Sequence, residues 1–142
     1  IPYSAANLGV AVAAHKMAVE YSKTRETFGA PIATRQAVQW MMVDSEVEIR
    51  ACRWLIWEAA WQYDAGEDFR QAASIAKVFS ADILGKVVDR AIQIHGGYGV
   101  TKALPLERWY REARVRRIGE GPTEIQKMVI AREILNPGGP PG

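Results

Sequence analysis

Apolar residues recur every three to four positions along almost the whole chain. This spacing is typical of amphipathic helices, which bury one face and expose the other. Segments that contain glycine or proline interrupt the pattern at four places, where connections are expected. No alternating, strand-type segment of any length competes with it. The sequence therefore predicts five helices, over about 4–23, 34–64, 69–95, 106–117 and 123–135.

The starts of two of these helices carry capping signals. Ser4 is expected to cap the first helix, because a serine hydroxyl accepts a hydrogen bond from an amide of the first turn. Thr123 and Gln126 have the Thr-x-x-Gln spacing of a capping box at the last helix. Exposed amides at that start also favour an anion or a polarised carbonyl oxygen. The apolar stripe of the first helix is expected to consist of Leu8, Val12, His15 and Val19.

Two of the predicted helices are long enough to set the architecture. At 1.5 Å per residue, helices of about 27–31 residues span roughly 40–46 Å, and short connections make them antiparallel neighbours. The fold class is therefore all-α: an up-down antiparallel four-helix bundle with a short additional helix, 106–117, packed at one end. Residues 1–135 are expected to form this domain, and the Pro/Gly-rich segment 136–142 a frayed tail or linker.

The composition limits the class of protein. The chain has 142 residues and a formal net charge of only +2, which argues against a nucleic-acid partner. No apolar run approaches the ~18 residues needed to cross a bilayer, and no signal peptide is visible. Cys52 is the only cysteine, and we expect it to be a small apolar filler in a reducing compartment. The chain begins without Met and reads as a piece of a longer protein.

Three tryptophans lie on one face of the second predicted helix. Trp54, Trp57 and Trp61 are spaced i, i+3 and i+7. Such a stripe is more often core or subunit interface than ligand site, because each indole buries a large area. We expect a helix-to-helix or dimer seam here.

Several familiar chemistries find no support in the sequence. His15 and His95 are far apart, and neither Cys-x-x-Cys nor His-Glu-x-x-His occurs, so no metal site is expected. The glycine-rich segment 96–99 follows a helix rather than a strand, which excludes a dinucleotide fingerprint. A basic cluster with interleaved Glu107 and Glu112 predicts a solvated, salt-bridged helix face, or else a contact with an anionic ligand or another domain. Its arginines are Arg108, Arg111, Arg114, Arg116 and Arg117.

Glu120 stands out as a candidate for chemistry. It lies between Gly119 and Gly121, with Pro122 next, just before the last helix. Flanking glycines let other groups approach a carboxylate closely. From these local features alone, a surface turn with an accidental glutamate and a functional carboxylate are equally good interpretations.

Four separated segments decide between these interpretations. Each is weak alone, but together they occur in order, at matching spacing and on matching helices. They resemble the acyl-CoA dehydrogenase family, and the resemblance covers nearly the whole chain before the tail. The segments are Arg25–Gly29, Arg35–Gln36, Gln93–Gly99, and Arg111–Arg114 followed by Gly119–Gln126.

The resemblance implies a protein of three domains, of which this chain would be the last, assembled as a homodimer or homotetramer with FAD at a subunit boundary. Arg25 would lie near the FAD pyrophosphate of a neighbouring subunit, where a forked, permanently charged donor suits phosphate oxygens. Gln36 would reach the adenine half. The other cofactor-binding residues that the resemblance implies are Thr27, Phe28, Gln93, Ile94, His95, Gly96, Gly97, Thr123 and Glu124.

Glu120 matches the catalytic glutamate of the family. The implied reaction is α,β-dehydrogenation of an acyl-CoA thioester: Glu120 removes the α-proton and a hydride leaves the β-carbon for the flavin. The backbone N–H of the glutamate helps to polarise the thioester carbonyl in this family, as in an oxyanion hole. Gly121 would lie against the substrate. Once the acyl chain displaces water, the resemblance implies a carboxyl pKa suited to a base near neutrality.

Two positions depart from the family pattern. Gly119 stands where many members have Tyr, and Pro122 where many have Thr. These departures leave the exact substrate open and leave room for a branched, cyclic or unusual acyl group. Alternatives are a related flavin acyl-CoA oxidase or N-hydroxylating monooxygenase, or a non-catalytic helical oligomerisation module. The resemblance also implies electron-transfer flavoprotein as electron acceptor, and the cytoplasm of a bacterium or the mitochondrial matrix of a eukaryote as the compartment.

Overall fold

The computed structural model describes residues 1–136, and within them the five predicted helices are confirmed with ends that shift by at most two residues. Short 3₁₀ helices lie at the end of the first predicted connection, Ile32–Thr34, and at the start of the third, Gly96–Val100. Of the predicted tail, 137–142 lies outside the described residues. The helices are α1 (Pro2–Thr24), α2 (Gln36–Asp64), α3 (Arg70–His95), α4 (Leu106–Arg116) and α5 (Thr123–Leu135).

The segment expected to be a plain loop after α1 is a minimal hairpin. Strands β1 (Glu26–Thr27) and β2 (Ala30–Pro31) pair antiparallel. The two residues between them, Phe28 and Gly29, both have left-handed backbone, with φ of 51° and 75°. Two consecutive positive φ values are what a two-residue hairpin turn requires.

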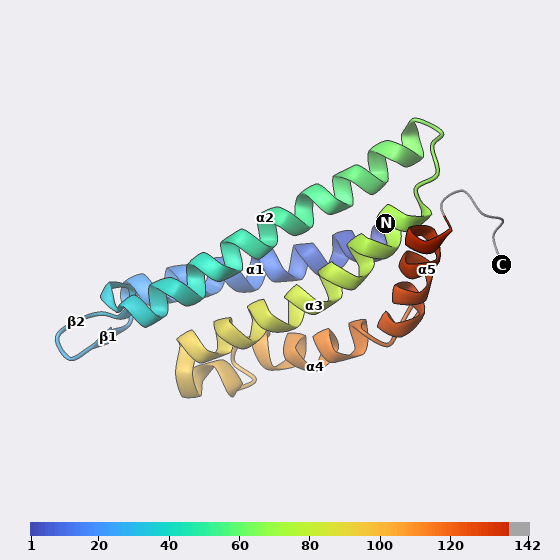
Figure 1. Cartoon of the computed structure of the whole chain (residues 1–142). Helices are drawn as coiled ribbons and strands as arrows, with labels where there is room; N and C mark the ends of the chain where they lie inside the picture. Colours follow the sequence, from blue (N-terminus) through green and yellow to red (C-terminus); the bar gives the residue numbers. More distant parts are fainter. Residues whose placement is uncertain (137–142) are drawn as a thin grey trace.

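The long helices α1, α2 and α3 run beside one another in alternating directions (Figure 1). The shorter α4 returns along α3, and α5 packs on the other half of α3, near the N-terminus. Each of the four other helices contacts α3, which is therefore the centre of the bundle. The expected up-down bundle is present, but the helix placed at its end is α5, whereas α4 lies along α3.

The buried face of α1 differs from the predicted stripe. Leu8, Val12, His15 and Val19 are only half-buried. Small side chains occupy the innermost positions instead, which lets α1 approach α3 closely. Ser4 is one of them, so the prediction that it caps the helix is wrong: Ile1 precedes the first turn and Pro2 opens it, where a missing N–H costs nothing. The buried residues of α1 are Ser4, Asn7, Ala11, Ala14, Ala18 and Ser22.

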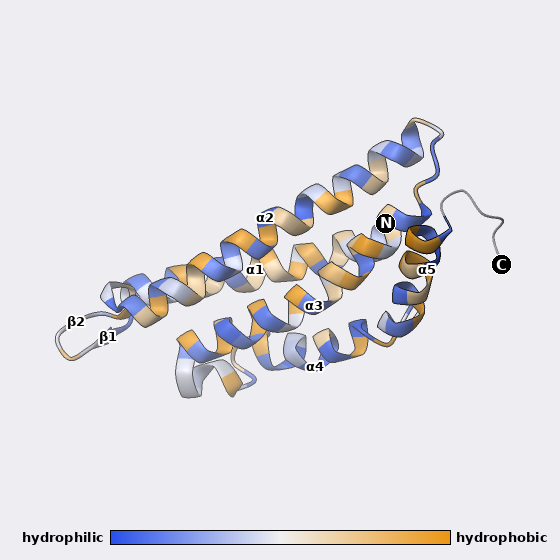
Figure 2. Cartoon of the chain, in the orientation of Figure 1, coloured by the Kyte–Doolittle hydropathy of each residue, from blue (hydrophilic) through white to orange (hydrophobic). Residues whose placement is uncertain are grey.

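The core lies along α3. Its largest fully buried side chains there are Ile83, Leu84, Val87 and Val88. Cys52 of α2 is also buried, as expected for a filler, and burial raises the pKa of its thiol to about 11. Hydrophobic positions recur along every helix in Figure 2. Within the described residues, no helix is both long and apolar enough to cross a membrane.

The tryptophan stripe of α2 faces outward. Trp54 and Trp57 are 67% and 53% exposed, and their rings meet edge to face at 5.0 Å between centroids. These indoles therefore do not form a helix-to-helix seam within this chain. A seam with another subunit stays a prediction. The exposed apolar residues of α2 with helical spacing are Trp40, Val43, Val47, Trp54, Trp57 and Trp61.

Candidate active site

The loop between α4 and α5 holds Glu120 in an unusual conformation. Glu120 and Gly121 have φ of 55° and 84°, in the left-handed region. A glutamate there is strained by about 1–3 kcal/mol, so the surrounding structure must hold it. Lys77 of α3 does so by donating from Nζ to the Gly121 carbonyl oxygen at 2.6 Å. The carboxylate of Glu120 is exposed.

Both ends of this loop meet at one carbonyl. The Thr123 amide and the Thr123 hydroxyl donate to the Arg117 carbonyl oxygen at 3.0 and 3.2 Å. The capping-box prediction is therefore wrong, since Thr123 is the first residue of α5 and Pro122 occupies the cap position. The Thr123 amide is also already used and cannot bind an anion. Gln126 instead lies over the loop, with Nε2 only 2.5 Å from where a Cβ on Gly121 would stand.

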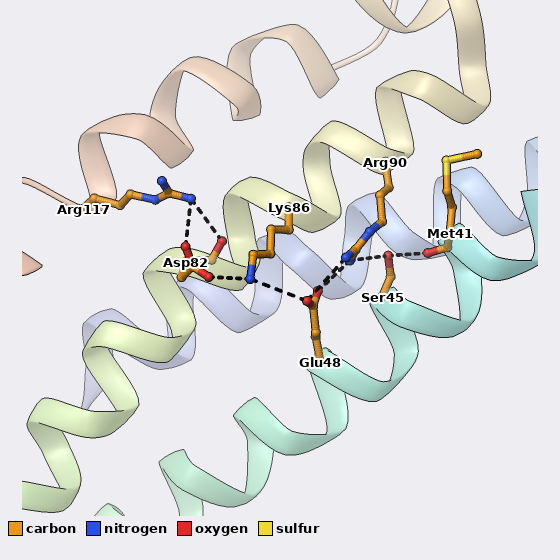
Figure 3. Close-up of polar contacts among 7 residues, drawn as sticks. All are labelled: Met41, Ser45, Glu48, Asp82, Lys86, Arg90 and Arg117. Atoms are coloured by element: carbon orange, nitrogen blue, oxygen red, sulfur yellow. Dashed lines mark hydrogen bonds and ion pairs between the residues drawn. The ribbon is translucent and has the colours of Figure 1, made fainter. Parts of the chain in front are cut away.

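The side chain of Arg117 ties this loop to the bundle. Its Nη2 lies 3.1 Å from Oδ1 of Asp82 on α3. Asp82 also pairs with Lys86, and Lys86 approaches Glu48 of α2. Figure 3 shows this chain of contacts running from the α4–α5 loop across α3 to α2. The loop that carries Glu120 is thus fixed to the two longest helices by charged groups.

Glu48 and Arg90 form the firmest part of that network. Arg90 Nη1 lies 2.6 Å from Glu48 Oε2, and Nη2 lies 3.4 Å from Oε1 (Figure 3). The hydrogen bond to Glu48 raises the pKa of the Arg90 guanidinium, although partial burial opposes it. Because both side chains are largely shielded from solvent, this pair holds α2 against α3 more strongly than a surface pair does.

Glu120 lines a cavity of about 480 Å³ between the start of α1, the first half of α3 and its own loop. The cavity carries polar groups from all three segments. Lys77 is only 6% exposed, and burial lowers the pKa of its ammonium while Glu124 opposes that change. The lining residues are Ile1, Pro2, Tyr3, Ser4, Ala73, Ser74, Lys77, Glu120 and Gln126. Sequence reasoning missed Tyr3 and Lys77. The only signal for Lys77 was a lone lysine at helical spacing from the buried Ser74 and Ala81.

A second cavity, of about 570 Å³, gathers six of the predicted cofactor residues from two separate segments. His95 is buried there, and its ring stacks on Tyr21 at 4.3 Å between centroids. His95 Nδ1 lies 2.7 Å from the Ala91 carbonyl oxygen. Because a carbonyl only accepts, Nδ1 carries the hydrogen of this bond and is its donor. The six residues are Arg25, Thr27, Ile94, His95, Gly96 and Gly97.

The remaining predicted cofactor residues lie elsewhere. Phe28, at the hairpin turn, is 99% exposed, and Gln36 and Gln93 are also exposed. Thr123 and Glu124 line a third cavity, of about 660 Å³, between α3, α4 and α5.

The two ends of the molecule therefore carry different groups. Ser4 belongs to the Glu120 cavity and Tyr21 to the His95 cavity. Both residues lie on α1, so they are about 26 Å apart at 1.5 Å per residue. One copy of this domain does not bring Glu120 together with Arg25 and His95.

The basic cluster of α4 is mostly the solvated, salt-bridged face that was expected. Arg111 pairs with Glu107, and Arg108 with Glu112, each at i,i+4 spacing. Arg116 differs, since its guanidinium lies over the ring of Tyr3 at 4.9 Å. Within residues 1–136, no cluster of three or more metal-binding side chains occurs.

The fold is a helical bundle with a separate cavity at each end of α1, and sequence comparison identifies its family. The family described as "Acyl-CoA dehydrogenase, C-terminal domain" matches residues 1–135, so this chain belongs to the acyl-CoA dehydrogenase family. The chain is 44% identical over 135 residues to the 3-(aryl)acrylate reductase of Clostridium sporogenes, covering 95% of this chain and 36% of that protein.

Solved structures agree with this assignment. The butyryl-CoA dehydrogenase of Megasphaera elsdenii matches with a TM-score of 0.92 and 38% identity, over 94% of this chain and 35% of that one. A structure described as the electron transferring flavoprotein of Acidaminococcus fermentans matches with a TM-score of 0.92 and 40% identity, over 94% and 35%. The chain thus spans about a third of the length of these relatives.

Proposed function

We propose that this domain is part of a flavoenzyme that α,β-dehydrogenates an acyl-CoA thioester, with Glu120 as the base that removes the α-proton. The observation that carries the proposal is the setting of Glu120. Its carboxylate is exposed at a cavity, on a loop that Lys77 and Arg117 hold in a left-handed conformation. A general base needs this fixed placement, because a misplacement of about 1 Å can cost on the order of 10² in rate.

The backbone of the same residue can supply the second requirement. A proton α to a thioester is acidic only when the carbonyl is polarised. Among the hydrogen bonds of residues 1–136, none uses the Glu120 N–H, so this donor is available to the thioester oxygen. As Glu120 takes the proton, negative charge develops on that oxygen, where a fixed N–H stabilises it. FAD, when bound, accepts the hydride that leaves the β-carbon.

The His95 cavity fits a dinucleotide cofactor. Arg25 supplies a cation at its edge, and nothing stands within 4 Å of where a Cβ would project from Gly96 or Gly97. Bare backbone of this kind admits the close approach of a phosphate or ribityl chain, and His95 Nε2 offers an acceptor to a hydroxyl when the ring is neutral. We assign FAD binding to Arg25, Thr27, Ile94, His95, Gly96 and Gly97, with Phe28, Gln36 and Gln93 at the margin.

A complete site then needs two copies of the domain. The ~26 Å that separates the two cavities along α1 supports an arrangement in which Arg25 and His95 of one subunit serve the FAD beside Glu120 of another. A homodimer or homotetramer supplies this geometry, and the exposed tryptophan face of α2 offers a surface for it. Electron-transfer flavoprotein is the proposed electron acceptor, which the likeness to the Acidaminococcus fermentans structure supports.

The reverse direction uses the same groups. The relative from Clostridium sporogenes is named a 3-(aryl)acrylate reductase. If this chain works in that direction, Glu120 delivers a proton to the α-carbon of an unsaturated substrate, as microscopic reversibility requires. Both directions depend on the Glu120 carboxyl group, so one variant tests both.

The test is Glu120→Gln in the flavoenzyme that contains this domain. Glutamine keeps the size and the backbone N–H but cannot take a proton. Anaerobic stopped-flow should show flavin reduction by an accepted acyl-CoA slowed by at least ~10²–10⁴-fold, with flavin content and acyl-CoA binding retained. Flavin bleaching at the wild-type rate would place the base elsewhere and refute the proposal.

A further inference from the structure

The absence of a side chain at position 119 has a cause within this chain. A Cβ built on Gly119 would lie 2.9 Å from the Tyr3 hydroxyl oxygen, which is closer than such atoms tolerate. The next atoms are the Val115 carbonyl oxygen at 3.6 Å and Tyr3 Cζ at 3.9 Å, both ordinary contacts. Gly119 is not among the glycines with positive φ. A side chain at 119 therefore requires the Tyr3 hydroxyl to move, whereas the backbone conformation of Gly119 does not oppose one.

Tyr3 is held firmly in this position. It comes from the first turn of α1, and two cations lie over its ring, with Arg116 Cζ at 4.9 Å and Lys77 Nζ at 5.9 Å from the centroid. Cation–π contacts of this kind favour one ring orientation. Tyr3 also lines the cavity that Glu120 lines. Its ring thus stands at the residue immediately before the proposed base.

We infer that Tyr3 is a specificity-determining residue, whose phenol ring fills the space beside Glu120 that a side chain at 119 would fill and so limits the width of the acyl group that reaches Glu120. The inference rests on the proposed function. In this inference α1, and not the loop, supplies the wall of the cavity beside Glu120. The residue that sets the cavity width lies 116 positions before Gly119. Changes at position 3 therefore alter the substrate range without altering the loop.

The packing half of the inference has a test that needs no activity. In the flavoenzyme that contains this domain, Gly119→Ala should lower the apparent Tm by about 2–5 °C, as overpacking does. In a Tyr3→Phe background, where the offending oxygen is gone, the same substitution should cost less than about 1 °C. Gly9→Ala is the matched control, because nothing stands within 4 Å of its Cβ position. Equal losses in both backgrounds would overturn the packing relationship.

The functional half is tested with two probes, butyryl-CoA and cyclohexane-1-carbonyl-CoA. Tyr3→Ala should raise the ratio of kcat/KM for the cyclic over the linear thioester by at least ~10-fold, as expected when a pocket wall recedes. Tyr3→Phe, which keeps the ring, should preserve the wild-type ratio. If Tyr3→Ala does not fold, Tyr3→Leu serves in its place. An unchanged ratio in a folded, flavin-loaded variant would overturn the inference.

These outcomes are separable from the proposed function. If the flavin of Glu120→Gln is reduced at the wild-type rate, the proposed base is wrong. The Tm comparison still tests the packing of Tyr3 against Gly119, because it does not depend on catalysis. If Glu120→Gln is slow and Tyr3→Ala leaves the substrate ratio unchanged, only the specificity role of Tyr3 fails.

Discussion

The Lys77 ammonium donates to the Gly121 carbonyl oxygen at 2.6 Å, across 44 residues of sequence. Lys77 is almost fully buried, and the carbonyl belongs to the residue that follows Glu120. A hydrogen bond from a cation is stronger than a neutral one, and it acts here on the peptide that fixes the left-handed backbone. Lys77 is therefore a positioning residue for the Glu120 loop.

Lys77→Met should slow flavin reduction by at least ~10-fold in the flavoenzyme, because the carboxylate loses its fixed placement. In a Glu120→Gln background the same change should have little further effect, since Lys77 acts through Glu120. Lys77→Arg, which can reach the same carbonyl, should recover part of the rate, and Lys16→Met on the surface of α1 is the control. Independent rate losses in the double variant would mean that Lys77 does not act through Glu120.

The Glu48–Arg90 pair gives a prediction about stability. Arg90→Met leaves the largely shielded Glu48 with only Lys86, at 3.9 Å, as a cation. It should reduce the free energy of unfolding by about 1–2 kcal/mol, less than for a fully buried pair. The exposed Arg108–Glu112 pair is the matched control, because Arg108→Met should cost under ~0.5 kcal/mol. Urea denaturation of the two variants beside the wild type measures both. An equal loss of unfolding free energy in the two variants would show that solvent screens the Glu48–Arg90 pair as completely as the Arg108–Glu112 pair.

The pKa of His15 predicts a dependence on pH. Burial lowers it from its usual value of 6.5, and Glu46, at 3.5 Å, only partly opposes this. The unfolded chain therefore binds more protons at this residue than the folded chain as pH falls through about 6.5, so the His15 contribution is lost on acidification. His15→Gln should lose less stability than the wild type between pH 7.5 and pH 5.5, in a comparison of apparent Tm. A larger loss in the variant would reverse the assigned sign.

The helices and the family could be predicted from sequence, for different reasons. Apolar periodicity is local, and it located each helix end to within two residues. Four separated motifs gave the family, which the match over residues 1–135 confirms. The inner face of α1 was predicted wrongly because large apolar residues were preferred, whereas close contact with α3 selects small ones such as Asn7 and Ala11.

Some residues of the candidate site could also be predicted from the sequence, and others could not. The flanking glycines drew attention to Glu120 but left its role open, and only the four family segments favoured a catalytic glutamate. The roles of Glu120 and the cofactor residues stay predictions. Tyr3 and Lys77 could not be found, because the loop they contact is 116 and 44 residues away. Pairwise contacts at such separations leave no periodic signal in one sequence. The Thr-x-x-Gln spacing at Thr123 predicted a capping box wrongly, because the Thr123 hydroxyl donates to the Arg117 carbonyl oxygen instead.

The proposed cofactor site predicts the outcome of Arg25→Ala. Loss of a charge-assisted phosphate contact should lower the flavin content after purification and dialysis. Arg50→Ala removes a similar charge from the exposed surface of α2, and should retain flavin as the wild type does. Flavin absorbance per protein, measured after dialysis, is the readout. Undiminished flavin in Arg25→Ala would mean that Arg25 is misassigned.

The exposed face of α2 predicts self-association. Its large apolar residues between Trp40 and Trp61 follow helical spacing and are exposed, so they are not covered by α1 or α3. Exposed apolar surface of this kind marks an interface, and tryptophans near the centre of an interface contribute most of its binding energy. Trp54 and Trp57 already contact each other edge to face in the single chain, and this contact favours one arrangement of the two rings.

Trp54→Glu should therefore weaken self-association of the flavoenzyme by about 30-fold or more, equivalent to about 2 kcal/mol. Sedimentation velocity over a concentration series measures this directly. Lys16→Glu, a charge change on the surface of α1, should leave the distribution of species unchanged. Since a complete site is proposed to need two subunits, Trp54→Glu should also release flavin on dilution. An oligomer that survives Trp54→Glu and Trp57→Glu together would mean that another surface joins the subunits, and the α2 stripe would then cover a different part of the same protein.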